Sequence, residues 1–140
     1  MGSRNGTVHN NDVSGVAAIT GTSRHSGPAI YIDGNRANSF NIGIYGNNVH
    51  NNHADGIAVA DEEPSRGSVS NIKIHDNTIN SNSIQGINGG TGISVFPDVK
   101  GIEIYNNTVE KNVQAFDFDG RAIGISNLNV HDNKFTNSTY

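Results

Sequence analysis

The chain has 140 residues, of which 34% are hydrophobic and 17 are glycine, and its formal net charge is −4. This length suits a single folded domain, and the absence of cysteine excludes a disulfide framework and thiolate metal sites. Lysine and arginine form no cluster of the kind that nucleic-acid binding needs, and no apolar run reaches the length of a membrane span. We therefore expect no nucleic-acid partner and no membrane segment.

The opening residues Met1-Gly2-Ser3 resemble an added leader. We accordingly expect residues 1–4 to be a leader and residues 5–140 to form one domain. The chain contains 22 asparagines, and asparagine and glycine are the residues that accept a left-handed backbone at tight corners. A fold with many corners is predicted.

A nine-residue phrase occurs five times along the chain, with starts 36, 30, 30 and 26 residues apart. The five copies are VHNNDVSGV from Val8, IYGNNVHNN from Ile44, IHDNTINSN from Ile74, IYNNTVEKN from Ile104 and VHDNKFTNS from Val130. A regular repeat with a drifting length is typical of a solenoid whose corners accept insertions. The sequence predicts an all-β, right-handed parallel β-helix of about four to five coils.

Within each phrase, apolar residues two positions apart share one face of a strand, as Ile72 and Ile74 do. Three residues after the second apolar residue stands a column of asparagines. Because stacked coils lie about 4.8 Å apart, we expect these amides to hydrogen-bond to one another along the axis as a buried ladder. The column consists of Asn11, Asn47, Asn77, Asn107 and Asn133.

A second apolar strand lies between the phrases, usually opened by a small residue, as in the segments 29–32, 56–59, 92–95 and 115–118. No 12-residue window carries a helical apolar stripe with caps. The phrases SNIKIHDNTINSN and KGIEIYNNTVEKN resemble the repeat of the pectin-lyase-like superfamily, in particular its NosD-like group of carbohydrate-binding and sugar-hydrolysing proteins. The resemblance spans residues 5 to 138 and implies a β-helix, expected to be a fragment of a longer one, that binds a polysaccharide in a groove on one parallel sheet.

Outward positions of the second strand and its exit loop carry acids, bases and aromatic rings, which are the groups that recognise sugars. The predicted substrate-binding residues are Tyr31, Asp33, Arg36, Phe96, Asp98 and Lys100. Solvation alone also explains charges in exposed loops, so this interpretation stays open.

Asp117 and Asp119 flank one residue of a predicted strand and should lie roughly 7 Å apart on one side of it. With Arg121 they are the candidate catalytic residues, because this separation suits an inverting pair of glycosidase carboxylates. The same oxygens could instead serve as ligands for Ca²⁺, and no other cofactor or metal is expected. The catalytic patterns known in the superfamily, such as Asn-Thr-Asp and Gly-His-Gly, are absent, which leaves catalysis open as a lyase or hydrolase activity.

One aromatic ring follows the second apolar residue of every phrase and should face outward; stacking for stability is the favoured interpretation of this column. The sequence thus predicts a polysaccharide-interacting module of a larger protein, such as a polysaccharide lyase, a glycoside hydrolase or a phage tailspike. The resemblance implies an extracellular or virion-associated location. The alternative is a structural spacer without a ligand, and coil ends without caps predict association of the chain with itself.

Overall fold

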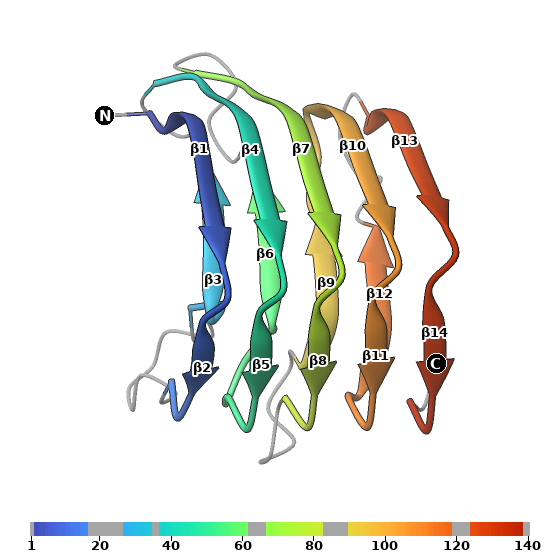
Figure 1. The fold of residues 1–140 in the computed structure, drawn as a ribbon. Coiled ribbons are helices and arrows are strands. Elements are labelled where there is room, and N and C mark those ends of the chain that lie inside the picture. Colours follow the sequence, from blue (N-terminus) through green and yellow to red (C-terminus); the bar gives the residue numbers. More distant parts are fainter. Residues whose placement is uncertain are drawn as a thin grey trace, which may run out of the picture.

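The computed structural model describes residues 2–16, 27–34, 37–61, 67–82, 90–118 and 124–138. These residues form a right-handed parallel β-helix in which the chain winds forward one coil at a time (Figure 1). None of the described residues belongs to a helix. The predicted architecture is confirmed.

Three parallel sheets run along the helix axis, which we term sheets A, B and C. Sheet A contains β1 (Arg4–His9), β4 (Ser39–Tyr45), β7 (Val69–His75), β10 (Val99–Tyr105) and β13 (Ser126–His131). Sheet B contains β2 (Asp12–Ser14), β5 (Asn48–His50), β8 (Thr78–Asn80), β11 (Thr108–Glu110) and β14 (Lys134–Thr136). Sheet C contains β3 (Ile30–Asp33), β6 (Ile57–Ala60), β9 (Thr91–Val95) and β12 (Gln114–Phe118).

The sequence repeat sets the register of the stacked strands. Ile44 lies opposite Ile74, and Ile74 opposite Ile104, so that equivalent phrase positions meet in neighbouring coils. These three isoleucines are fully buried, together with inward residues of sheets B and C such as Val49 and Ile57. The core is therefore a continuous apolar column enclosed by the three sheets.

The predicted asparagine ladder lies at the corner between sheets A and B. Asn47 Nδ2 donates to Asn77 Oδ1 at 2.9 Å, and Asn77 Nδ2 donates to Asn107 Oδ1 at the same distance. Asn77 also donates to the carbonyl oxygens of Ile44 and His75, which ties each corner to the strand before it. All three amides are buried, and the ladder is confirmed; its end members Asn11 and Asn133 are bonded into it but are exposed and half-buried, respectively.

A second buried ladder, which the sequence analysis missed, lies after the strands of sheet B. Asn52 Nδ2 donates to Asn82 Oδ1 at 2.9 Å, and Asn82 Nδ2 donates to Asn112 Oδ1 at 3.0 Å. Each member stands five residues after a member of the first ladder, which is the sequence signal that could have revealed it. The equivalent positions of the first and last phrases hold Val16 and Ser138, so this ladder is confined to the middle coils.

The strands of sheet C begin at close contacts with the core. A Cβ atom added to Gly56 would lie 2.7 Å from Ile79 Cγ2, nearer than real Cβ atoms approach. This contact is the physical reason for the small residue that opens the second strand.

The last coil is more open than the coils before it. Val130 and Phe135 occupy the inward positions equivalent to Ile104 and Val109, yet they are 37% and 45% exposed. The fully buried state of the same positions one coil earlier shows that each coil is covered by the next.

Candidate functional site

The outer face of sheet A carries three columns of side chains that run along the helix axis. The first is a column of amides, in which Asn41 Nδ2 donates to Asn5 Oδ1 at 2.8 Å and Asn71 Nδ2 donates to Asn41 Oδ1 at 2.6 Å. All three residues are exposed and have a left-handed backbone, with φ of 52° to 55°. Gly101 and Asn127 occupy the same position in the next two coils, with φ of 67° and 54°. The left-handed backbone therefore extends over more coils than the hydrogen-bonded amides do.

The second column is formed by the aromatic rings that the sequence predicts to face outward. Successive centroids are 4.9, 5.1, 4.8 and 5.2 Å apart and the ring planes are parallel to within 11°. The rings are stacked as predicted, and the faces of Tyr45, His75 and Tyr105 are occupied by neighbouring rings; the contribution of this stacking to stability stays a prediction. A ligand can therefore contact the edges of these rings, where the phenol oxygens and imidazole nitrogens of successive rings are separated by about one coil spacing. Its members are His9, Tyr45, His75, Tyr105 and His131.

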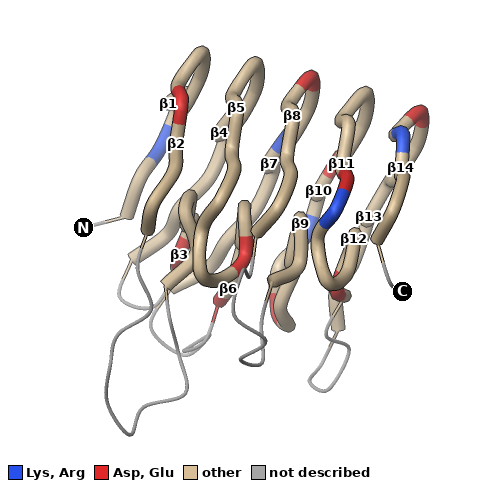
Figure 2. Tube along the Cα trace, turned by 90° about the horizontal axis from the view of Figure 1, so that it is seen from below, with Lys and Arg blue, Asp and Glu red and all other residues tan. Residues whose placement is uncertain are grey.

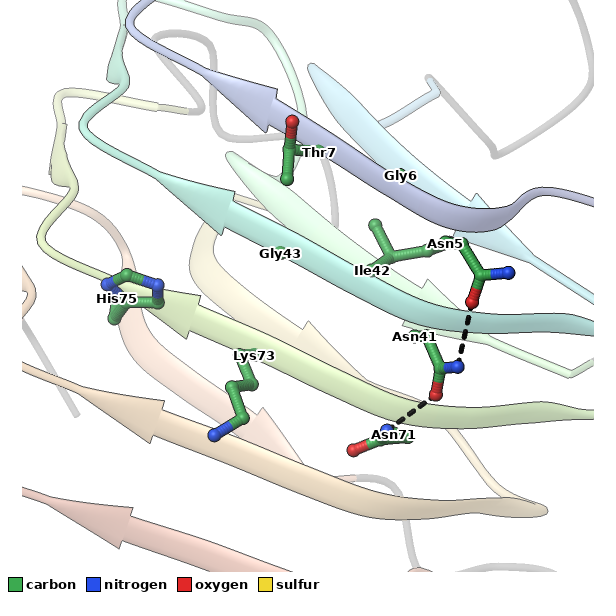
Figure 3. A pocket seen from close by; sticks show the side chains of 9 residues that line it. All are labelled: Asn5, Gly6, Thr7, Asn41, Ile42, Gly43, Asn71, Lys73 and His75. Carbon is green, nitrogen blue, oxygen red and sulfur yellow. Dashed lines mark hydrogen bonds between the residues drawn. The ribbon is translucent and has the colours of Figure 1, made fainter.

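Between the two columns lies a third, whose strand positions are in register: Thr7, Gly43, Lys73, Glu103 and Asn129. The missing side chain at Gly43 leaves an open depression of about 340 Å³ across β1, β4 and β7 (Figure 3). We call this depression the sheet A groove. It is lined by Asn5, Thr7, Asn41, Gly43, Asn71 and Lys73, with His75 at one side.

An ion-pair chain borders the groove. Lys73 Nζ lies 2.9 Å from Glu103 Oε2, and Glu103 Oε1 lies 3.7 Å from His131 Nε2. The hydrogen bond to Glu103 raises the pKa of Lys73, and the same bond lowers the pKa of Glu103. The pKa of His131 is raised first by its hydrogen bond to Asp132, at 2.8 Å, and then by Glu103.

Elsewhere on the described surface the charges are dispersed. The lysine, arginine, aspartate and glutamate residues that the structure describes are spread over the coils rather than gathered on one face (Figure 2). Within the same described ranges, no three histidine, aspartate or glutamate side chains are grouped to hold a metal ion. The groove is therefore a site of neutral hydrogen-bonding groups with one paired cation at its border.

Of the predicted substrate-binding residues that the structure describes, Tyr31 and Asp33 lie on β3, Phe96 and Asp98 follow β9, and Lys100 lies on β10. Tyr31 on β3 and Asp117 on β12 occupy the same column of the sheet, with Ala58 and Ser94 between them. That places three strand spacings, roughly 14 Å, between the two. Ala58 and Ser94 are 0% and 1% exposed, so the line is not continuous at the surface.

Ser94, on β9 between Ala58 and Asp117 in this column, has a local structural role. Its Oγ donates to Asp55 Oδ2 at 3.0 Å, while Asp55 Oδ1 accepts the backbone N–H groups of Gly90 and Thr91 at 3.0 and 3.1 Å. Asp55 thus fastens the start of β9 to the corner that precedes β6 in the coil before it.

The remaining predicted residues occupy separate positions. Asp33 ends β3, Phe96 follows β9, Asp98 stands in a tight turn at φ of 63°, and Lys100 is exposed on β10. Arg36, Asp119 and Arg121 lie outside the described residues. The proposed spacing of Asp117 and Asp119, and with it the candidate catalytic pair and the Ca²⁺ ligands, therefore stays a prediction.

The sheet A groove was not predicted from the sequence. Its amide column stands six residues before the first buried ladder in each coil, which is a readable signal. Gly43 gave no signal, because its importance depends on side chains that come from the preceding coil.

No protein-family model, curated protein or solved structure matches this chain. Among the described residues, no helix is long and apolar enough to cross a membrane. Fold and site together define a parallel β-helix with two internal asparagine ladders and a groove of exposed amides and ring edges on its outer face.

Proposed function

We propose that this chain is a glycan-binding β-helix module, which holds a polysaccharide along the outer face of sheet A. The observation that carries the proposal is the alignment of two hydrogen-bonding columns on either side of the groove, one of amides and one of ring edges. Planar amides present donors and acceptors side by side, which suits the neighbouring hydroxyl groups of a sugar.

The repeat of the columns supports a polymeric ligand. Equivalent groups recur at the coil spacing, so an extended chain that lies along the axis meets similar contacts at each coil. Weak contacts at successive coils add up to a higher affinity when the sugars that make them are linked in one chain. A monosaccharide would make the contacts of one coil only. The resemblance of the repeat to the pectin-lyase-like superfamily favours the same ligand class.

The proposal concerns binding rather than catalysis. Glu103, which pairs with Lys73 at the border of the groove, has a lowered pKa. A carboxylate with these properties is ill suited to donate a proton as a general acid, and its ion pair leaves it less available to activate a water molecule. The separate positions of Tyr31, Asp33, Phe96 and Asp117, on or next to sheet C, remain a second candidate surface for the same ligand class.

The test is affinity electrophoresis against neutral and acidic polysaccharides, with Asn41→Gly as the diagnostic variant. Glycine preserves the left-handed backbone, as Gly101 does at the same position of a later coil, and removes only the amide. We expect the Kd for the retained glycan to rise about tenfold, the equivalent of about 1.4 kcal/mol.

Asn127→Gly is the matched control, since Asn127 belongs to the same column but lies outside the groove. It should leave the affinity unchanged. If Asp117→Asn lost binding while Asn41→Gly bound as tightly as the wild-type chain, the binding site would lie on sheet C instead. Failure of the wild-type chain to retain any glycan would favour the structural spacer instead.

A further inference from the structure

The groove contains a recess of methyl size at Gly43. A Cβ atom built on Gly43 would lie 3.5 Å from Tyr45 Cδ1 and 3.6 Å from Thr7 Cγ2, which are ordinary van der Waals contacts. The backbone at Gly43 is thus uncovered between a ring and a methyl group, and the open depression above it leaves room for a small apolar ligand group to rest on this glycine.

The fold does not require glycine at this position. Gly43 has no left-handed backbone, and the residues that occupy the same column in other coils all carry side chains. Those residues are Thr7, Lys73, Glu103 and Asn129. The glycine therefore creates space at the surface and does not serve a backbone conformation.

An amide stands beside the recess, two residues earlier on the same strand. Asn41 Nδ2 carries two hydrogens, and one of them is donated to Asn5. Asn41 Oδ1 has two lone pairs, and one of them accepts a hydrogen bond from Asn71. Asn41 can therefore donate to one ligand atom and accept from another, as it does with its neighbours in the ladder. Figure 3 shows Asn41 and Gly43 facing the same depression.

The polar groups at the recess are uncharged. Lys73, the cation of the groove, extends toward β10 and is paired with Glu103 at 2.9 Å (Figure 3). A carboxylate ligand would have to compete with Glu103 for this ammonium group, and the net charge of −4 opposes the approach of a polyanion. A ligand ammonium group would meet the apolar recess.

We propose that the sheet A groove is specific for glycans that carry 2-acetamido groups, with the acetamido methyl in the Gly43 recess and its N–H and C=O bonded to the Asn41 amide. This inference rests on the proposed function and names its ligand class. An acetamido group combines one methyl group with one donor and one acceptor, which is the set of partners that Gly43, Thr7, Tyr45 and Asn41 provide together.

The experiment is isothermal titration calorimetry with three β-1,4-linked hexamers that differ only at carbon 2 of each sugar. They are the hexamers of N-acetylglucosamine, glucose and glucosamine. We expect the N-acetylglucosamine hexamer to bind at least about tenfold more tightly than either of the others.

Gly43→Ala supplies the decisive variant, because its methyl group fills the recess at van der Waals distance and leaves the fold intact. It should weaken binding of the N-acetylglucosamine hexamer to the level of the glucose hexamer while the affinity for the glucose hexamer stays the same. Gly27→Ala, which adds a methyl group in open space before β3, is the matched control and should change neither affinity. Thermal unfolding of each variant verifies that it is folded.

The inference would be overturned, while the proposed function stands, if the N-acetylglucosamine and glucose hexamers bound equally well. It would also be overturned if the chain retained other glycans but did not bind the N-acetylglucosamine hexamer. An equal loss for both hexamers in Gly43→Ala would also overturn it, because the recess would then have no selective role. Binding of no glycan by the wild-type chain would instead remove the proposed function itself.

Discussion

Asn77 shows how one buried amide joins three coils of the stack. Its two amide hydrogens are shared among three acceptors, the carbonyl oxygens of Ile44 and His75 and the Oδ1 of Asn107, and its oxygen accepts from the backbone N–H and the side chain of Asn47. Asn77→Ala would leave several of these buried groups without partners, at about 1–3 kcal/mol for each. We expect a loss of about 3 kcal/mol or more in the free energy of unfolding, measured by urea denaturation.

Asn48→Thr is the control for this variant. Asn48 is exposed on the outer face of sheet B, where the next coil carries Thr78 in register. Its free energy of unfolding should change by less than about 0.5 kcal/mol. Equal losses in the two variants would show that the ladder adds nothing beyond ordinary polar contacts.

His131 gives a pH-dependent prediction at the same scale. Because Asp132 and Glu103 raise its pKa in the folded state, its charged form favours folding. This contribution is fully present below the pKa of the unfolded state and is lost as the pH rises through the higher folded value. In an NMR titration the His131 imidazole should have a pKa above 6.5, and Asp132→Asn should lower it more than Glu103→Gln. A value at or below 6.5 in the wild-type chain would contradict the assignment.

At the scale of the strand, burial depends on the coil that follows. Ile104 on β10 and Val130 on β13 are in register, but Ile104 is fully buried and Val130 is 37% exposed. Ile104→Asp should abolish folding, because an unpaired charge in the core costs several kcal/mol against a total stability of about 5–15 kcal/mol.

Val130→Asp should remain folded with a modest loss, since its carboxylate can reach water at the open face of the last coil. Circular dichroism and thermal unfolding distinguish the two variants. A folded Ile104→Asp chain with an unchanged melting temperature would be incompatible with the column of inward residues.

The strands of sheets A and B and the first asparagine ladder could be predicted because the same residues recur at nearly constant spacing. The amide ladder requires the same side chain in neighbouring coils, so a position such as Asn77 is repeated in every coil. The groove could not be predicted in the same way, because outward positions are free to vary. Gly43 becomes a recess only when Thr7 of the preceding coil and Tyr45 of its own strand are placed beside it. Loop residues such as Asp119 follow no repeat, which is why their spacing stays a prediction.

At the scale of the whole molecule, each coil contacts only its neighbours, so stability should vary along the axis. The middle strands β7 and β10 pair on both sides, whereas β13 pairs only with β10. We expect amide hydrogen exchange to be slowest in β7 and β10 and fastest in the end strands β1, β2, β13 and β14, which pair on one side only. Uniform protection along the chain would indicate that the five coils unfold as one unit.

The exposed face of the last coil leads to a prediction about association. Val130 and Phe135 leave apolar surface open at this end, beside unpaired strand edges of β13 and β14. The ladder is polar along the axis: Asn107 donates to Asn133 Oδ1, and Asn11 at the other end of the ladder donates to Asn47 Oδ1. By the same pattern, the last coil presents the backbone N–H of Asn133 as a donor, and the first coil presents Asn11 Oδ1 as an acceptor. These two groups are complementary in a head-to-tail contact between two chains.

We predict that the 140-residue chain associates head to tail, with a mass by light scattering that rises with concentration above the 14.8 kDa of one chain. Phe135→Lys should shift the distribution toward single chains, because a charged side chain at the contact disfavours its burial. Asn129→Lys adds the same charge to the exposed outer face of β13 and should leave association unchanged. A constant mass of one chain at all concentrations would show that the open coil face does not drive association, whereas equal effects of the two lysines would attribute association to charge alone.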